Sequence, residues 1–197
     1  MLPLVVEYAM TNWTTGQELH LDYIDTYSSP IGELTISCDG ESLTGLWLDS
    51  QKYFMEHVTE AEARSDLPVL LEARAWLDCY FAGKDPGFLP AVKPVGTAFR
   101  EQVWKLLVEI PYGQVTTYGE LARRIAASTG VAKMSSRAVG GAVGHNPISI
   151  IIPCHRVIGS NGSLTGFGGG IARKIQLLEL EGIDTGRYRI PTRGIAL

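Results

Sequence analysis

Cysteine is scarce in this sequence of 197 residues, and its three copies are widely separated. Cys38, Cys79 and Cys154 are too few and too scattered to form a disulfide framework, so we expect a reducing, cytoplasmic setting. No Cys-x-x-Cys pair is present, whereas a zinc site needs about four ligands. The sequence therefore predicts neither disulfide bonds nor a bound metal.

Long apolar runs are also missing. No run approaches the roughly 20 residues that a membrane-spanning helix needs. The opening MLPLVVEYAM has no basic segment followed by a long apolar one, so we expect no signal peptide. With 45% hydrophobic and 19% charged residues, the chain can bury a substantial core, and we expect a globular protein that does not contact membranes.

Charge is unevenly distributed, although the net charge of the whole chain is only −4. From Thr97 onward, twelve Lys and Arg residues stand against six Asp and Glu residues, a balance of +6. Before Thr97, five basic residues stand against fifteen acidic ones, a balance of −10. This asymmetry is typical of a basic face that binds a polyanion, but two ordinary surfaces without a partner would give the same counts.

The N-terminal half has the pattern of a small sheet followed by a helix. Apolar and β-branched residues alternate with polar ones, which predicts half-buried antiparallel strands separated by turns. A helical spacing of apolar residues then ends at a glycine. We expect an unpatterned arm over residues 1–20, strands at Tyr23–Tyr27, 33–38 and 43–49, and a helix within 67–83.

The C-terminal half has the pattern of a helical domain. The Pro- and Gly-rich segment from Gly83 to Thr97 is a linker, which predicts one domain over residues 1–96 and a second over 97–197. Thr117 and Glu120 form a capping box at the start of a helix. We expect helices at 98–110, 118–126 and 135–146, the last two forming a helix-turn-helix.

The helix expected at 135–146 is unusually rich in small residues. Glycine costs about 0.5–1 kcal/mol relative to alanine within a helix, so Gly140 and Gly141 need a reason. Tight packing against another helix would supply one. Because Arg137 begins this helix and the surrounding half is basic, close approach of a nucleic acid is the better explanation.

Cys154 lies in the segment SIIIPCHRVIG, after an apolar run that predicts a buried strand ended by Pro153. It could be an inert core thiol, because free cysteine is commonly buried. It could also be a nucleophile, since a thiolate needs a nearby base or cation and His155 and Arg156 follow at once. Neighbouring side chains on an extended chain point to opposite faces, so Cys154 and His155 need a turn or a bridging water to communicate.

Two later features support the nucleophile. The loop GSNGSLTGFGGG, residues 159–170, is too rich in glycine to pack a core, and its single ring, Phe167, suits a flat polar ligand such as a nucleobase. The next helix, expected to end at Gly182, carries Glu181 in its last turn, where a carboxylate opposes the helix dipole. A solvated glutamate would need no explanation, but one that hydrogen-bonds His155 would justify the position.

Together these segments resemble the O6-alkylguanine-DNA alkyltransferases, also called methylated-DNA–protein-cysteine methyltransferases. The resemblance runs continuously from about residue 97 to 183, through FREQVWKLL, IPYGQVTTYGELA, SRAVGGAVGHNPISIIIPCHRVIGSNG and GFGGGIARKIQLLELEG. The N-terminal half is more weakly similar to the family's ribonuclease-H-like domain. The implied fold class is α/β (α+β), with a ribonuclease-H-like α/β domain followed by a mostly helical domain that contains the helix-turn-helix.

The resemblance implies DNA repair in a single turnover, without a cofactor. Cys154 would take the alkyl group from O6 of guanine, and from O4 of thymine, after the nucleotide is flipped out of the duplex. His155 would act through a water as general base, with Glu181 orienting it. Tyr118 would donate a proton to the leaving guanine, and Asn146 would support the turn at the site.

The resemblance also implies how DNA is held by a monomer that binds the duplex through its minor groove. Arg137 would fill the gap left by the flipped base. The implied DNA-binding residues are Arg137, Tyr118, Arg100, Ser160, Gly140 and Gly141, and the implied pocket residues are Val157, Phe167, Gly168 and Ser149.

Three features depart from the family pattern. The connection ASTGVAKMSS, residues 127–136, is longer than usual, which changes the surroundings of Arg137. Ser149 replaces a proline of some members, which predicts a roomier pocket that accepts larger alkyl groups. The zinc ligands of some N-terminal domains have no counterpart. Two other function classes stay open: a sensor that binds alkylated DNA without reacting, although such proteins lack the cysteine, and a cysteine hydrolase.

Overall fold

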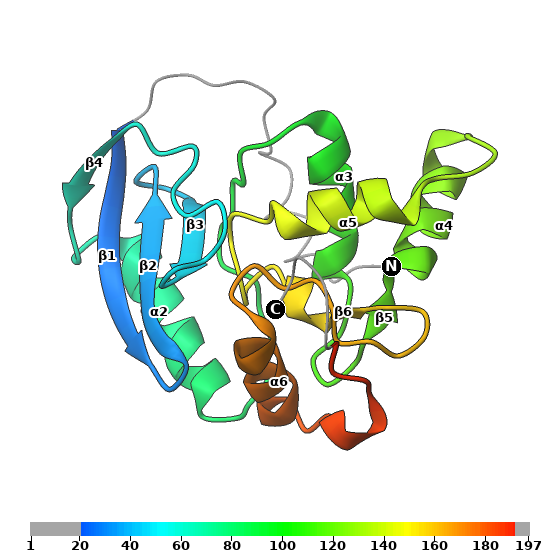
Figure 1. The fold of residues 1–197 in the computed structure, drawn as a ribbon. Helices are drawn as coiled ribbons and strands as arrows, with labels where there is room; N and C mark the ends of the chain where they lie inside the picture. Colours follow the sequence, from blue (N-terminus) through cyan, green and yellow to red (C-terminus); the bar gives the residue numbers. More distant parts are fainter. Residues whose placement is uncertain (1–20, 192–197) are drawn as a thin grey trace. The chain divides into compact units, whose positions relative to one another are not determined.

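The computed structural model describes residues 21–191, which form two compact units (Figure 1). The first unit comprises the described chain up to Thr97 together with Pro147–Ile151, and the second comprises Ala98–Asn146 and the chain from Ile152 onward. The expected mixed class, a sheet domain followed by a helical domain, is confirmed. Pro147–Ile151 was predicted to lie in the C-terminal domain, and the expected arm lies outside the described residues.

The first unit is built on a four-stranded sheet with the order β3-β2-β1-β4. The three predicted strands are present as an antiparallel meander of β1 (Leu21–Ser29), β2 (Gly32–Cys38) and β3 (Leu43–Leu48). The fourth strand, β4 (Glu60–Ala63), pairs parallel to β1 and was missed. Its sequence EAEA is exposed at every position, so it carries no alternation of buried and exposed residues.

Helix α2 (Pro68–Phe81) completes the first unit and packs against β1 and β2. The predicted helical spacing of apolar residues is present, and Leu70, Ala73, Leu77 and Tyr80 are buried. β3 is buried at all six positions, which explains its continuous apolar character. The core of the unit includes Leu34, Ile36, Leu46, Leu48, Leu70, Ala73, Leu77 and Tyr80.

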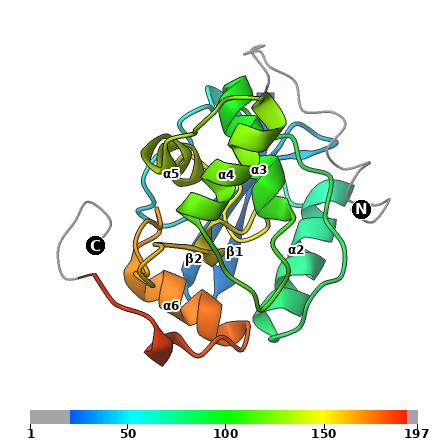
Figure 2. The ribbon, with the colours of Figure 1, turned by 90° about the vertical axis from the view of Figure 1, so that its right-hand side faces the viewer.

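The second unit is mainly helical. α3 (Ala98–Val108), α4 (Tyr118–Thr129) and α5 (Ser136–Gly144) pack on one another (Figure 2). The predicted cap is present, because the amide of Glu120 donates to Oγ1 of Thr117 at 3.1 Å. α4 and α5 are the expected helix-turn-helix.

A short parallel pair links α4 to the segment after Cys154. β5 (Thr116–Thr117) immediately precedes α4, and it pairs with β6 (Val157–Ile158). α6 (Ile171–Leu180) follows the glycine-rich loop and ends, as predicted, at Gly182 with a left-handed φ of +78°. Across residues 21–191, no helix has the length and apolarity to span a bilayer.

The prediction of a strand at Ile148–Ile152 is wrong. Ile148 makes only an isolated bridge to Leu46, and the chain turns at once. Ile150 has a φ of +70°, and the amide of Ile151 donates to the carbonyl of Ser149 at 2.8 Å. This is a γ-turn in the left-handed region, a conformation that costs about 1–3 kcal/mol for a residue other than glycine. The apolar character of this segment predicted its burial correctly, but it could not reveal that the chain reverses direction at Ile150.

Candidate active site

Cys154 begins a single 3-10 turn, Cys154–Arg156, and is 5% exposed. Pro153 precedes it with φ −81° and ψ 63°, and the amide of Cys154 donates to the carbonyl of Ile152 at 2.8 Å. These values describe an inverse γ-turn. The turn supplies the change of direction that an extended Cys-His pair lacks.

Asn146 supports this turn from the end of α5. Its Nδ2 donates to the carbonyl of Ile152 at 2.7 Å, and the side chain is buried. The same carbonyl therefore accepts from the Asn146 amide and from the Cys154 backbone. This contact ties the segment after α5 to the turn that begins at Cys154.

His155 and Glu181 meet, although 26 positions separate them in the sequence. Nε2 of His155 lies 2.7 Å from Oε1 of Glu181, and both side chains are fully buried. Burial lowers the pKa of His155 even against the opposing charge of Glu181, so the imidazole is neutral. Because Nε2–H faces the carboxylate, the lone pair of the neutral ring lies on Nδ1, where a base needs it.

Arg156 is a partner of Glu181 that the sequence did not reveal. Its Nε donates to Oε2 of Glu181 at 2.9 Å, its Nη2 donates to Oε1 at 3.0 Å, and its Nη1 donates to the carbonyl of Ile110 at 2.7 Å. The amide of Gly113 also donates to Oε2 at 3.1 Å. Burial alone would raise the pKa of Glu181, but His155 and Arg156 outweigh it and lower the pKa to about 2.

Tyr118, the first residue of α4, lies over the glycine-rich loop. Its hydroxyl is 3.1 Å from the carbonyl of Gly166 and 3.3 Å from that of Thr165. Burial, with the charge of Cys154 as a second cause, raises the pKa of Tyr118, so the phenol keeps its proton at neutral pH. Gly166 has a φ of +83°, and a Cβ there would lie 2.1 Å from the tyrosine hydroxyl. Only glycine fits this position.

Lys174 is a second feature that the sequence did not reveal. It lies on α6 with no exposed surface, and its Nζ donates to the carbonyls of Val157 at 2.5 Å and Thr165 at 2.8 Å. Burial lowers its pKa to about 7, against an opposing effect of the Cys154 charge. Lys174 thus joins the strand after Cys154 to the loop that Tyr118 contacts.

Phe167 is buried rather than exposed, at 4% of its surface. Its ring centroid lies 6.4 Å from that of His155, in an edge-to-face arrangement. Gly168 follows it and is half-buried. The loop therefore places the ring of Phe167 next to the imidazole of His155.

The predicted DNA-binding residues differ in exposure. Arg137, Gly141 and Ser160 are exposed, whereas Gly140 and Arg100 are half-buried. Arg137 and Gly141 are four residues apart, so they share one face of α5. A Cβ at Gly141 would meet nothing within 4 Å, and one at Gly140 would touch the Tyr118 ring at 3.7 Å. The small residues leave this face of α5 open for close approach.

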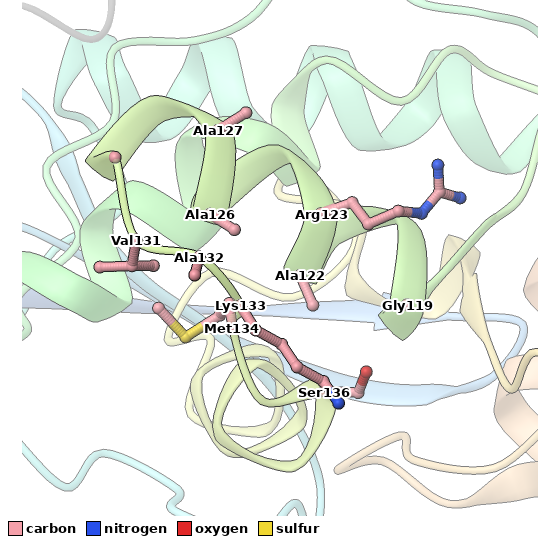
Figure 3. A pocket seen from close by; sticks show the side chains of 11 residues that line it. Gly119, Ala122, Arg123, Ala126, Ala127, Val131, Ala132, Lys133, Met134 and Ser136 are labelled. Carbon is pink, nitrogen blue, oxygen red and sulfur yellow. The ribbon is translucent and has the colours of Figure 1, made fainter.

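The long connection between α4 and α5 forms a pocket with α4 (Figure 3). Its volume is about 680 Å³, and small apolar side chains such as Ala122, Ala126 and Ala132 line it. The side chains of Arg123 and Lys133 lie among the lining residues. Lys133 thus places a cationic side chain in the connection that leads to α5.

Ser149, predicted as a pocket residue, lies within the first unit. Its amide donates to the carbonyl of Leu46 at 2.8 Å, and its hydroxyl contacts Oε1 of Gln51 at 2.9 Å. The side chain is 1% exposed. In the described part of the chain, no group of three or more His, Cys, Asp or Glu side chains could hold a metal ion.

Comparison with known proteins agrees with this geometry. Residues 23–89 match the ribonuclease-like domain of 6-O-methylguanine DNA methyltransferase, and residues 98–183 match its DNA binding domain. The chain belongs to the 6-O-methylguanine DNA methyltransferase family. The matched segments contain every residue of the Cys154–His155–Glu181 arrangement.

Similar proteins of this family come from distant organisms. A methylated-DNA–protein-cysteine methyltransferase of Haemophilus influenzae is 47% identical over 163 residues, which cover 82% of this chain and 87% of the relative. One from Methanosarcina acetivorans is 43% identical over 160 residues, which cover 81% of this chain and 98% of the relative. Among solved structures, the crystal structure of Mycobacterium tuberculosis OGT in complex with DNA superposes with a TM-score of 0.69. The two chains are 45% identical, and the superposition covers 81% of this chain and 92% of the OGT chain.

Proposed function

We propose that Cys154 is the alkyl acceptor of this DNA-repair protein, and that O6-alkylguanine and O4-alkylthymine in double-stranded DNA are its substrates. Membership of the family makes the chain a DNA-binding, single-turnover methyltransferase that takes the alkyl group onto its own cysteine. The observation that carries the assignment to Cys154 is the neutral His155 beside it, held by the buried carboxylate of Glu181 at 2.7 Å.

The reaction is a displacement at the alkyl carbon. His155 takes the thiol proton of Cys154 through a water, and the thiolate sulfur attacks the carbon bonded to O6. The carbon–oxygen bond breaks, and guanine leaves with its electron pair while Tyr118 supplies a proton. The neutral state of His155 and the protonated state of Tyr118 both support these roles. The product is a thioether, which neither residue can cleave, so the protein is consumed.

Recognition requires the nucleotide to leave the stack, because its O6 is inaccessible within the duplex. Arg137, exposed at the start of α5, would fill the vacated space, and Gly140 and Gly141 would let the helix approach the minor groove. Arg100 and Ser160 would add contacts to the DNA. Val157 and Gly168 would bind the guanine edge through backbone groups, with Phe167 as a wall. A carbonyl has two lone pairs, so the Lys174 contact leaves Val157 able to accept from guanine.

The protein would work alone in the cytoplasm. One copy contains the nucleophile, the base, its orienting carboxylate and the DNA-facing helix, which supports a monomer on duplex DNA. Three cysteines without a disulfide among them support a reducing compartment.

Mass spectrometry tests the proposal directly. The protein is mixed with duplex DNA that carries one O6-methylguanine, and we expect one added methyl group on the peptide that contains Cys154. Cys154→Ala should bind the duplex without reacting, whereas the matched variant Cys38→Ala should react normally, because Cys38 is buried in the first unit. Tight binding with an unmodified Cys154 would support a sensor, and repeated turnover would support a hydrolase.

A further inference from the structure

The backbone just before the nucleophile is held in an unfavourable conformation. Ile150, a fully buried β-branched residue, has a φ of +70°, which is rare for such a side chain. Such a conformation persists only where surrounding contacts determine it, and it is concentrated at functional sites. Cys154 follows four residues later, so whatever holds Ile150 also sets the start of the path to the reactive sulfur.

The contacts that hold this turn come from the first unit. The carbonyl of Leu46 accepts from the amide of Ser149 at 2.8 Å, and the amide of Leu46 donates to the carbonyl of Pro147 at 2.9 Å. The segment is therefore attached to β3 by backbone hydrogen bonds on the N-terminal side of Ile150. On the C-terminal side, the 2.8 Å bond from the Ile151 amide closes the γ-turn.

One side-chain contact completes the attachment. Oε1 of Gln51 lies 2.9 Å from the hydroxyl of Ser149 and also accepts from the amide of Leu48 at 3.2 Å. Gln51 is 6% exposed, and its backbone amide donates to the carbonyl of Leu48 at 3.0 Å. A buried polar side chain with its acceptor satisfied by two donors is rigid, because moving it would leave a donor without a partner.

We propose that Gln51 and Ser149 form a clamp that fixes the turn at Ile150 and so presets the position of Cys154 for alkyl transfer. This inference rests on the proposed function of Cys154 and adds a task for the N-terminal unit beyond that of a scaffold. Gln51 is a positioning residue, since it acts through Ser149 and the four residues that lead to Cys154. Asn146 fixes the same path at the carbonyl of Ile152, nearer to the sulfur.

Substitutions on both sides of the clamp test it. Gln51→Met keeps the length of the side chain and removes the acceptor, whereas Ser149→Ala removes the hydroxyl. Gln51→Glu retains an acceptor oxygen in either protonation state, so this variant should keep the rate of alkyl transfer. The matched control is Ser37→Ala, which removes another buried hydroxyl of the same unit, 2.7 Å from Oγ1 of Thr44.

The measurement is the rate constant for benzyl transfer from free O6-benzylguanine to Cys154, followed by intact-protein mass. We expect Gln51→Met and Ser149→Ala each to lower it by about tenfold, since small displacements of a reacting group are costly. The double variant should be no slower than the slower single one, because both lose the same contact. Gln51→Glu and Ser37→Ala should stay within about threefold of the unmodified protein.

Two further readouts separate positioning from a general loss of stability. Affinity for undamaged duplex should not change in any variant, while hydrogen exchange at the amides of Ser149 and Ile151 should accelerate only in the clamp variants. The clamp is refuted if Gln51→Met and Ser149→Ala react as fast as Ser37→Ala, or if their effects on the rate multiply in the double variant. An unmodified protein that fails to alkylate at Cys154 would instead overturn the proposed function, and the clamp with it.

Discussion

His155 and Glu181 form a fully buried pair, with Nε2 2.7 Å from Oε1, at the end of α6. The carboxylate stands at the C-terminal end of a helix, where the dipole disfavours a negative charge. Two Arg156 nitrogens and the amide of Gly113 compensate for this position by donating to the same carboxylate. The Glu181 carboxylate therefore holds the His155 imidazole in the tautomer that carries its proton on Nε2, and Arg156 keeps the carboxylate charged.

Replacing Glu181 with glutamine should slow alkyl transfer by about 10- to 100-fold, less than the roughly 100- to 10,000-fold that general base catalysis contributes, because His155 itself is still present. The amide would place a donor group against Arg156 and would no longer polarise His155. The control is Glu179→Gln on the exposed side of the same helix, which should react normally. The rate of reaction with free O6-benzylguanine gives the measurement, and equal rates for the two variants would rule out the orienting role.

The stability of the fold should depend on the charge of Glu181. Its pKa is 4.5 unperturbed and about 2 in the fold, and this depression corresponds to about 3 kcal/mol of stability. Because the folded pKa is the lower one, this stability is complete above pH 4.5 and is lost as the pH falls through 2. Denaturant unfolding from pH 7 to pH 2 should therefore show the gap between the unmodified protein and Glu181→Gln narrowing toward acid. A gap that is constant with pH would contradict the assignment.

The local features of the fold could be predicted from the sequence because they depend on neighbouring residues. The Thr117 cap and the αL stop at Gly182 follow from side-chain chemistry within one helical turn. β4 and the turn at Ile150 could not be predicted. The first has no apolar alternation, and the second is imposed by β3, which lies about 100 residues earlier in the chain.

The site was predictable to a similar extent. Motif positions and the resemblance suggested His155 and Glu181 as partners, and the geometry joins them. Nothing in the sequence marked Lys174 as buried, because a lysine on an amphipathic helix is ordinarily exposed. The bidentate contact of Arg156 was hidden for a different reason, since its partner lies 25 positions away and is brought close only by α6.

Arg137→Ala should impair repair of duplex DNA far more than reaction with a free base. Arg137 is exposed at the start of α5, and its proposed task arises only when a nucleotide is flipped. We expect a loss of about tenfold or more with a duplex carrying O6-methylguanine, and a change of less than about twofold with free O6-benzylguanine. Arg187→Ala, which removes one exposed positive charge elsewhere in the same unit, controls for electrostatic attraction to DNA. Equal losses with the two substrates would contradict the finger role.

Gly166→Ala should disable Tyr118 specifically. The added Cβ would lie 2.1 Å from the Tyr118 hydroxyl, so either the ring or the loop must move, and the hydroxyl would lose its place over the carbonyls of Thr165 and Gly166. Gly170 is the matched control, because its φ of +91° resembles the +83° of Gly166 but a Cβ there meets nothing within 4 Å. Both variants place a side chain on a residue with a positive φ, which costs of order 1 kcal/mol or more.

The two glycine variants share a positive φ and differ in the contact with Tyr118. We expect Gly170→Ala to lower the melting temperature and to keep the alkyl-transfer rate, whereas Gly166→Ala should lower both. Tyr118→Phe, which removes the hydroxyl without adding an atom, should reproduce the slower rate. If Gly166→Ala reacts at the rate of Gly170→Ala, then the position of the tyrosine hydroxyl does not matter for transfer. Proton donation to the leaving guanine would then have to come from another group.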